Sequence, residues 1–151
     1  MTSVYRLVRR ERALDALSGE GARRYGGRWN PPGTAAVYAA ESRALAVLET
    51  FVHFTLEARD MRFVLITLEL PARARVERHS GARPPRSLAA SQGVGGAWLG
   101  GGDGLALVVP SVLVPQEKNY VLNVAHAQFA GVRIASTEPF SFDERLWSAG
   151  R

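Results

Sequence analysis

Cysteine is absent from this chain, and several kinds of site are excluded with it. Without a thiol among its 151 residues, the protein has no disulfide framework, no cysteine-ligated zinc or iron–sulfur cluster and no thiolate nucleophile. Long apolar runs are also missing near the start, where Arg6, Arg9, Arg10 and Arg12 interrupt any secretory signal. We therefore expect a cytoplasmic protein in a reducing compartment, without a membrane span.

Lysine is almost absent as well. Of the 19 basic residues only Lys118 is a lysine, and the formal net charge is +5. A positive balance favours an anionic partner such as nucleic acid, a phosphorylated small molecule or an acidic protein. The planar arginine fork can hold phosphate or carboxylate through two parallel hydrogen bonds. Codon bias of the genome is the simpler explanation for most of these arginines.

Length and composition indicate one globular domain over residues 1–151, with 46% hydrophobic and 22% charged residues. Periodicity predicts a helix over Glu41–Leu56 and a second helix within residues 87–99. The glycine-rich segment 19–33 is predicted as loop. Strands are expected at 5–10 (a short strand or turn), 35–40, 62–70, 75–78, 105–109, 111–114, 120–124 and 132–136. Few helices among many strands predict an α+β domain with mixed or antiparallel sheets.

A glycine-rich turn at residues 26–33 carries the first candidate site residue. Its glycines permit backbone angles and close approaches that other residues avoid, so the turn can direct Arg28 inward. The competing interpretation is a surface turn in which Trp29 packs on the core and Arg28 points to solvent. Taken alone, the turn favours this second interpretation.

Tyr38 and Glu49 are the next candidates. Tyr38 lies in the predicted strand 35–40, where core packing with a hydrogen-bonded hydroxyl is its simplest role. Glu49 lies in the apolar stripe of the predicted helix, four residues after Leu45 and three before Val52. Burial of an unpaired carboxylate costs on the order of several kcal/mol. Glu49 is therefore either a functional group or the structural partner of an arginine.

A further hydroxyl, Ser111, interrupts the apolar run 109–115. No glycine elbow or Ser-His-Asp pattern surrounds it, so a hydrolase nucleophile is not indicated. The three histidines, His53, His79 and His126, lack metal-ligand spacing. No metal is predicted.

Considered together, these segments resemble the RES-domain toxins of bacterial toxin–antitoxin pairs. The resemblance rests on GGRWNPPGTAAVYAAESRALAVLE, on VPSVLVPQEKNYVLNVAHAQF and on Tyr5-Arg6 near the start, and it covers nearly the whole chain. One small departure is Ala127, where the family is expected to have a proline.

The resemblance implies both a fold and a set of site residues. The fold would be similar to that of the ADP-ribosyltransferase toxins. The residues that give the family its name would be Arg28, Glu49 and Ser111, with Tyr38 as a further active-site residue. Asn119 and Asn123 would lie in the asparagine-containing strand of the family, with Asn123 among the residues that bind NAD.

The implied activity is on NAD as substrate, without a metal. Cleavage of the nicotinamide–ribose bond, by hydrolysis or phosphorolysis, would deplete NAD, and the alternative is ADP-ribose transfer to a protein. The charge of Glu49 would support an oxocarbenium-like transition state. Arg28 would hold the diphosphate, Tyr38 would stack on nicotinamide, and Ser111 would orient a ribose or phosphate oxygen.

The resemblance also implies a partner. We expect an Xre-type helix-turn-helix antitoxin protein, with the toxin as a homodimer within the complex and without direct contact to nucleic acid or membrane. The more distant alternative is a basic nucleic-acid-binding module, favoured by aromatic residues close to arginines. No helix-turn-helix, RNA-recognition signature or basic helix in the sequence supports it.

Overall fold

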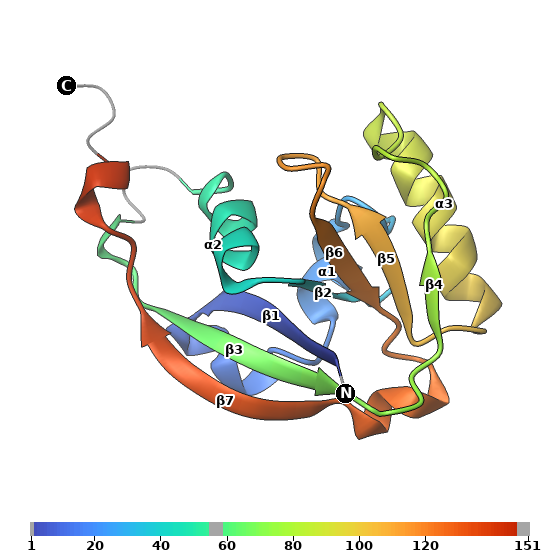
Figure 1. Ribbon diagram of the computed structural model, residues 1–151, viewed down its shortest axis with the longest axis horizontal. Coiled ribbons are helices and arrows are strands. Elements are labelled where there is room, and N and C mark those ends of the chain that lie inside the picture. Colours follow the sequence, from blue (N-terminus) through green and yellow to red (C-terminus); the bar gives the residue numbers. More distant parts are fainter. Residues whose placement is uncertain (1, 55–58, 148–151) are drawn as a thin grey trace.

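The computed structural model describes residues 2–54 and 59–147. Its strands form one sheet in the order β4-β5-β6-β2-β1-β3-β7 (Figure 1). In chain order they are β1 (Thr2–Arg9), β2 (Val37–Ala40), β3 (Phe63–Leu70), β4 (Val76–Arg78), β5 (Ala106–Pro110), β6 (Lys118–Leu122) and β7 (Arg133–Phe140). Strands β4 and β5 run parallel, whereas the other neighbouring pairs are antiparallel. The predicted α+β class is confirmed.

Three α-helices accompany the sheet within the described ranges: α1 (Glu20–Tyr25), α2 (Arg43–Phe51) and α3 (Leu88–Gly101). Both longer helices begin at a serine cap. The side chain of Ser42 accepts from the Leu45 N–H, and that of Ser87 accepts from the Ala90 N–H. Short 3-10 turns lie at Arg10–Asp15, Ala127–Gly131 and Glu144–Leu146. No helix in the described part of the chain combines the length and apolarity needed to cross a membrane.

The sheet divides between β1 and β2. Strand β1 pairs with β3 from Thr2 to Arg9, but it meets β2 at a single residue pair, Tyr5 and Ala40. We call β1, β3 and β7 the β1 half, and β4, β5, β6 and β2 the β2 half. Figure 1 shows the two halves diverging, with α2 near their junction and α3 beside the outer strands of the β2 half.

Three apolar clusters hold these parts together. The largest joins the two halves and contains Val4, Ile66 and Leu122. A second packs α2 on the β1 half through Leu45, Phe63 and Phe142, and the third surrounds Trp29 between α3 and the β2 half. Each half of the sheet thus has its own cluster in addition to the shared one.

The predicted strands at 35–40, 62–70, 75–78 and 105–109 agree with β2 to β5 within two residues, and the helix predicted within 87–99 is α3. The helix predicted over Glu41–Leu56 is observed as the shorter α2, which begins after the Ser42 cap and ends at Phe51, while its last two predicted positions lie outside the described residues. Two predictions were wrong. Segment 19–33 contains α1, whose ends are formed by the left-handed glycines Gly19 and Gly26. Segment 111–114 is a turn that begins where β5 ends at Pro110.

Candidate active site

A cavity of about 680 Å³ opens where the two halves part. Strands β1, β2 and β6, helix α2 and the segment from α1 into the following turn form its walls. Three predicted site residues, Arg28, Tyr38 and Glu49, line it. Its volume lies within the range typical of small-molecule sites.

The turn that carries Arg28 is fixed by one buried asparagine, Asn30. Its amide nitrogen donates to the carbonyls of Ala22 and Thr34, each at 2.9 Å. Its side-chain oxygen accepts from the Tyr38 hydroxyl at 2.6 Å. Gly27 completes the turn because a Cβ there would lie 2.7 Å from the Tyr38 hydroxyl oxygen. The turn therefore has little freedom to accept other residues or other shapes.

Tyr38 supports this turn as well as lining the cavity. Its hydroxyl donates to Asn30 and accepts from the Trp29 N–H at 2.9 Å. Burial raises the pKa of Tyr38 to about 12, so the hydroxyl is neutral at physiological pH. Because both of these bonds hold the turn, a ligand would meet Tyr38 mainly through its ring.

Helix α3 supports the turn from the other side. Trp29 is buried in the third apolar cluster, as one of the two sequence interpretations expected, and Gly95 of α3 packs against its backbone. The Gln92 amide donates to the Gly27 carbonyl at 3.0 Å. Arg28 does not point away into solvent: its Nη2 donates to the Pro85 carbonyl at 3.0 Å, and its side chain lines the cavity.

Two arginines in the cavity retain an unused donor. The Nε of Arg28 is buried without a hydrogen-bond partner among the described residues, and the same holds for the Nε of Arg6. Arg6 also donates through Nη1 to the Tyr38 carbonyl at 2.9 Å, and burial lowers its pKa against the opposing effect of Asp15. A buried unsatisfied donor costs about 1–3 kcal/mol. Such donors fit a site whose ligand supplies oxygen acceptors.

Glu49 faces this cavity from α2. Burial raises the pKa of Glu49, and the hydrogen bond from Asn119 and the charges of His53 and Arg28 oppose the rise. The Asn119 amide donates to Glu49 Oε2. Within the described ranges no basic side chain forms an ion pair with Glu49, which argues against a structural partner of an arginine.

The apolar stripe predicted around Glu49 was partly wrong. Leu45 is buried, but Leu48 is 38% exposed and Val52 is 50% exposed. Helix α2 is rotated so that Leu45 and Ala46 meet the core. Glu49 consequently lies beside the core contact, on the side that closes the cavity.

Ser111 and Asn123 lie away from the cavity lining. Ser111 is buried at the end of β5, where its hydroxyl accepts from the backbone N–H groups of Leu113 and Val114. Asn123 is buried beyond the opposite end of β6 and accepts from the Ala125 N–H. Contact of either residue with a substrate stays a prediction. The described ranges also contain no cluster of three potential metal ligands.

Arg6 was not predicted as a site residue, and the supporting contacts of Asn30, Gln92 and Asn119 were not predicted either. The sequence did contain a signal for Arg6. It lies two residues from both Val4 and Val8, so its charge falls on the same strand face as these two buried valines. The other contacts depend on which strands become neighbours, and no local pattern reports that.

Comparison with known proteins decides the family. A model of the RES domain matches residues 3–143. The chain belongs to the RES-domain family. Two relatives of this RES-domain protein match along almost their whole length. One is Toxin Res of Yersinia enterocolitica, 37% identical over 95% of this chain and 98% of the relative. The other is the Prs ADP-ribosylating toxin of Sphingobium, 36% identical over 96% of each chain.

A third relative matches over a short segment. The NAD(+) phosphorylase MbcT of Mycobacterium tuberculosis is 61% identical over 36 residues, which is 23% of this chain and 19% of MbcT. A chain in the solved M. tuberculosis MbcT–MbcA toxin–antitoxin complex resembles the whole fold, with a TM-score of 0.72 at 24% identity. That match covers 97% of the RES-domain protein and 86% of the solved chain, and it shows the fold alone.

Proposed function

We propose that this RES-domain protein is a toxin that acts on NAD+ by breaking the bond between nicotinamide and ribose. The observation that carries the proposal is one cavity lined by Glu49, which is free of an ion pair within the described ranges, and by Arg6 and Arg28, each of which has a buried Nε–H without a partner in the described structure. Relatives named for ADP-ribosylation and for NAD+ phosphorolysis support it, since both reactions break this bond.

The two arginines would bind the diphosphate of NAD+. Each has a buried Nε–H without a partner in the described structure, and diphosphate oxygens are strong charged acceptors. The Tyr38 ring would lie against the nicotinamide. Held in this way, the nicotinamide ribose would be presented to Glu49.

Glu49 would act on the charge that develops during cleavage. As the bond between C1″ of the nicotinamide ribose and the ring nitrogen breaks, its electron pair stays with nicotinamide, which leaves as a neutral molecule and needs no proton donor. The ribose becomes oxocarbenium-like, and a carboxylate beside it stabilises the positive charge. An acceptor oxygen then bonds to C1″, and the proton that it carried passes to solvent. The hydrogen bond from Asn119 would keep the Glu49 carboxylate in position.

The acceptor we propose is water or inorganic phosphate, with depletion of NAD+ as the toxic effect. Transfer of ADP-ribose to a cellular protein is the second candidate, because the relative named for ADP-ribosylation matches over 96% of both chains. We further propose that the toxin acts in the cytoplasm and is held inactive by an Xre-type antitoxin, in a complex where the toxin is a homodimer.

Incubation of the purified chain with NAD+ tests the proposal. Three reactions are compared: buffer alone, added inorganic phosphate, and a cell extract with labelled NAD+. Release of nicotinamide with ADP-ribose indicates hydrolysis, release with ADP-ribose 1″-phosphate indicates phosphorolysis, and labelled protein indicates transfer. Unchanged NAD+ in all three reactions, with a folded protein, would reject the proposal.

A further inference from the structure

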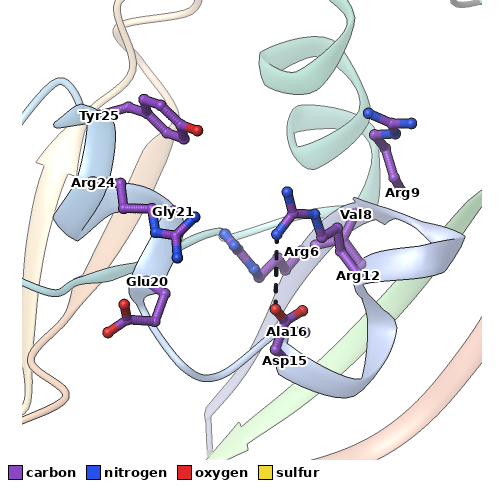
Figure 2. Close-up of a pocket in the computed structure, with 10 residues that line it drawn as sticks. All are labelled: Arg6, Val8, Arg9, Arg12, Asp15, Ala16, Glu20, Gly21, Arg24 and Tyr25. Carbon is purple, nitrogen blue, oxygen red and sulfur yellow. Dashed lines mark ion pairs between the residues drawn. The ribbon is translucent and has the colours of Figure 1, made fainter.

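A second pocket, of about 360 Å³, adjoins the cavity and shares Arg6, Gly21 and Tyr25 with it. Figure 2 shows arginines from β1, from the Arg10–Asp15 turn and from α1 converging on this space. Arg6 lines both spaces, whereas Glu49 lines the cavity and not this pocket. We call it the arginine pocket, and its charged lining residues are Arg6, Arg9, Arg12, Arg24, Asp15 and Glu20.

The positive charge of this pocket is only partly neutralised. Glu20 is held by Arg23, which is outside the lining, through hydrogen bonds of 2.7 to 3.0 Å. Arg12 lies 3.9 Å from Asp15 in an exposed pair, and such pairs contribute little. Arg24 has no hydrogen bond or ion pair within the described ranges. At least two guanidinium groups, those of Arg12 and Arg24, are therefore available to an anion.

We propose that the arginine pocket receives the adenosine half of the dinucleotide and that Arg12 and Arg24 accept a phosphate on its ribose, so that the protein consumes NADP+ as well as NAD+. This inference rests on the proposed function. With the nicotinamide ribose at Glu49 and the diphosphate at Arg6, the rest of the dinucleotide extends past Arg6 into the arginine pocket. Tyr25, which is 78% exposed, borders both spaces and offers its ring to adenine.

A 2′-phosphate matches the chemistry of the arginine pocket. Arginine is the residue that accommodates this group in dinucleotide sites, because its fork bonds two phosphate oxygens at once. NAD+ and NADP+ are identical at the nicotinamide–ribose bond, so the same bond breaks and the same C1″–oxygen bond forms with either one. The additional phosphate changes binding and leaves the reacting atoms unaltered.

Free inorganic phosphate carries the same chemistry and would be the acceptor in phosphorolysis. The position of the pocket favours the phosphate of the dinucleotide. Glu49 is absent from the lining of the arginine pocket, and the attacked ribose carbon must lie beside Glu49. Arg12 and Arg24 do not line the cavity that Glu49 lines, so a phosphate bound between them is not placed beside the attacked carbon.

Steady-state kinetics with both dinucleotides test the proposal. The double variant Arg12→Gln/Arg24→Gln is compared with wild type and with Arg73→Gln/Arg78→Gln, which removes equal charge at exposed positions outside both spaces. We expect the double variant to lower kcat/KM for NADP+ roughly tenfold or more, by loss of charge-assisted contacts. The kcat/KM for NAD+ should change far less in the double variant, and the control variant should change neither kcat/KM value.

Calorimetry gives a second readout that needs no turnover. Wild type should bind adenosine 2′,5′-bisphosphate more tightly than 5′-AMP, and the double variant should lose that difference. Equal affinity for the two nucleotides would overturn the proposal, as would consumption of NAD+ without NADP+. The proposal would also be overturned if the double variant changed the concentration of inorganic phosphate needed for turnover but left the ratio of kcat/KM for NADP+ to kcat/KM for NAD+ unchanged. If neither dinucleotide is consumed, the proposed function fails, while the calorimetric comparison still decides the binding of phosphate.

Discussion

The two halves of the sheet hold their parts of the site in different ways. The β2 half positions Arg28 through hydrogen bonds and close backbone approaches around Asn30 and Tyr38. The β1 half and the segment that follows β7 position Glu49 through apolar packing of α2. In this packing the Phe51 ring lies 5.0 Å from that of Trp147 and 5.4 Å from that of Phe142. Hydrogen bonds require narrow distances and angles, so they restrict the turn that carries Arg28 to one conformation. Apolar packing is less directional, so helix α2 can shift slightly without losing its contacts.

The halves meet through two polar contacts at the cavity. Arg6 of the β1 half donates to the Tyr38 carbonyl of the β2 half. Asn119 of the β2 half donates to Glu49 on α2. The relative position of Arg28 and Glu49 is therefore set at this junction. Variants on the Arg28 side should affect NAD+ affinity first, and variants on the Glu49 side should affect turnover first.

Gly95→Ala should have the largest effect on stability. Its Cβ would lie 1.7 Å from the Trp29 carbonyl oxygen, which is backbone and cannot rotate away, so α3 must move off the turn. We expect the free energy of unfolding to fall by about 3 kcal/mol or more, with loss of NAD+ affinity. Gly93→Ala is the matched control, because no atom outside its own helix lies within 4 Å of the new Cβ. The control should be stabilised by roughly 0.5–1 kcal/mol. Equal melting temperatures for the two variants would show that the close contact of Gly95 with the Trp29 backbone does not restrict this position.

Phe51→Ala tests the apolar packing of the Glu49 side. The ring is half-buried, so its loss should lower the free energy of unfolding by about 2 kcal/mol, less than for a fully buried phenylalanine. Because α2 carries Glu49, kcat should fall more than NAD+ affinity. Leu48→Ala, at an exposed position of the same helix, should change both quantities much less. Urea unfolding and steady-state kinetics measure these effects. An NAD+ affinity that falls more than kcat would refute the claim that the Glu49 side affects turnover first.

Tyr38→Phe removes two hydrogen bonds from the turn while keeping the ring. Asn30 and the Trp29 N–H lose their partner, so we expect a loss of about 1–2 kcal/mol in the free energy of unfolding. NAD+ should bind more weakly because the turn that carries Arg28 is loosened. Tyr120→Phe serves as the control, since no hydrogen bond of the Tyr120 hydroxyl is found in the described part of the chain. A Tyr38→Phe protein that matches this control in melting temperature and NAD+ affinity would exclude the role given to the hydroxyl.

Asn119→Ala should have the smallest effect, a shift in pH dependence. Catalysis needs ionised Glu49, so turnover declines as pH falls through its pKa, which burial places above the ordinary glutamate value. The Asn119 hydrogen bond lowers that pKa. Its removal should move the acidic limb of the kcat profile to higher pH. A limb that stays in place or moves to lower pH would show that Asn119 does not favour the ionised form.

The sequence predicted the parts of this comparison that are local. The glycines around Arg28 mark a turn, and periodicity places Glu49 on a helix. Periodicity does not say how that helix rotates on the sheet, which is why Leu48 and Val52 were wrongly placed in the buried stripe. Helix α1 was missed because the glycines that bound it are also the signal for a loop.

The contacts at the junction could not be predicted in the same way. Arg6 reaches Tyr38, and Asn119 reaches Glu49, because the strand order places β2 between β6 and β1. Strand order follows from pairing between distant segments, which local composition does not encode. The site therefore depends on sheet topology as much as on its motif residues.

The most direct test of the central claim is Glu49→Gln, studied for NAD+ binding, NAD+ turnover and thermal stability on one preparation. Between the ordinary glutamate pKa and the raised pKa of Glu49, the native state binds more protons than the unfolded state, so wild-type stability falls as pH rises. Glutamine removes that fall, and the melting temperature of the variant should equal or exceed that of wild type, increasingly so as pH rises through this window. We predict that the variant binds NAD+ and consumes it at least ~100-fold more slowly, the loss expected for one preorganised electrostatic group. A lower melting temperature with turnover per folded molecule near wild type would contradict a catalytic role for Glu49.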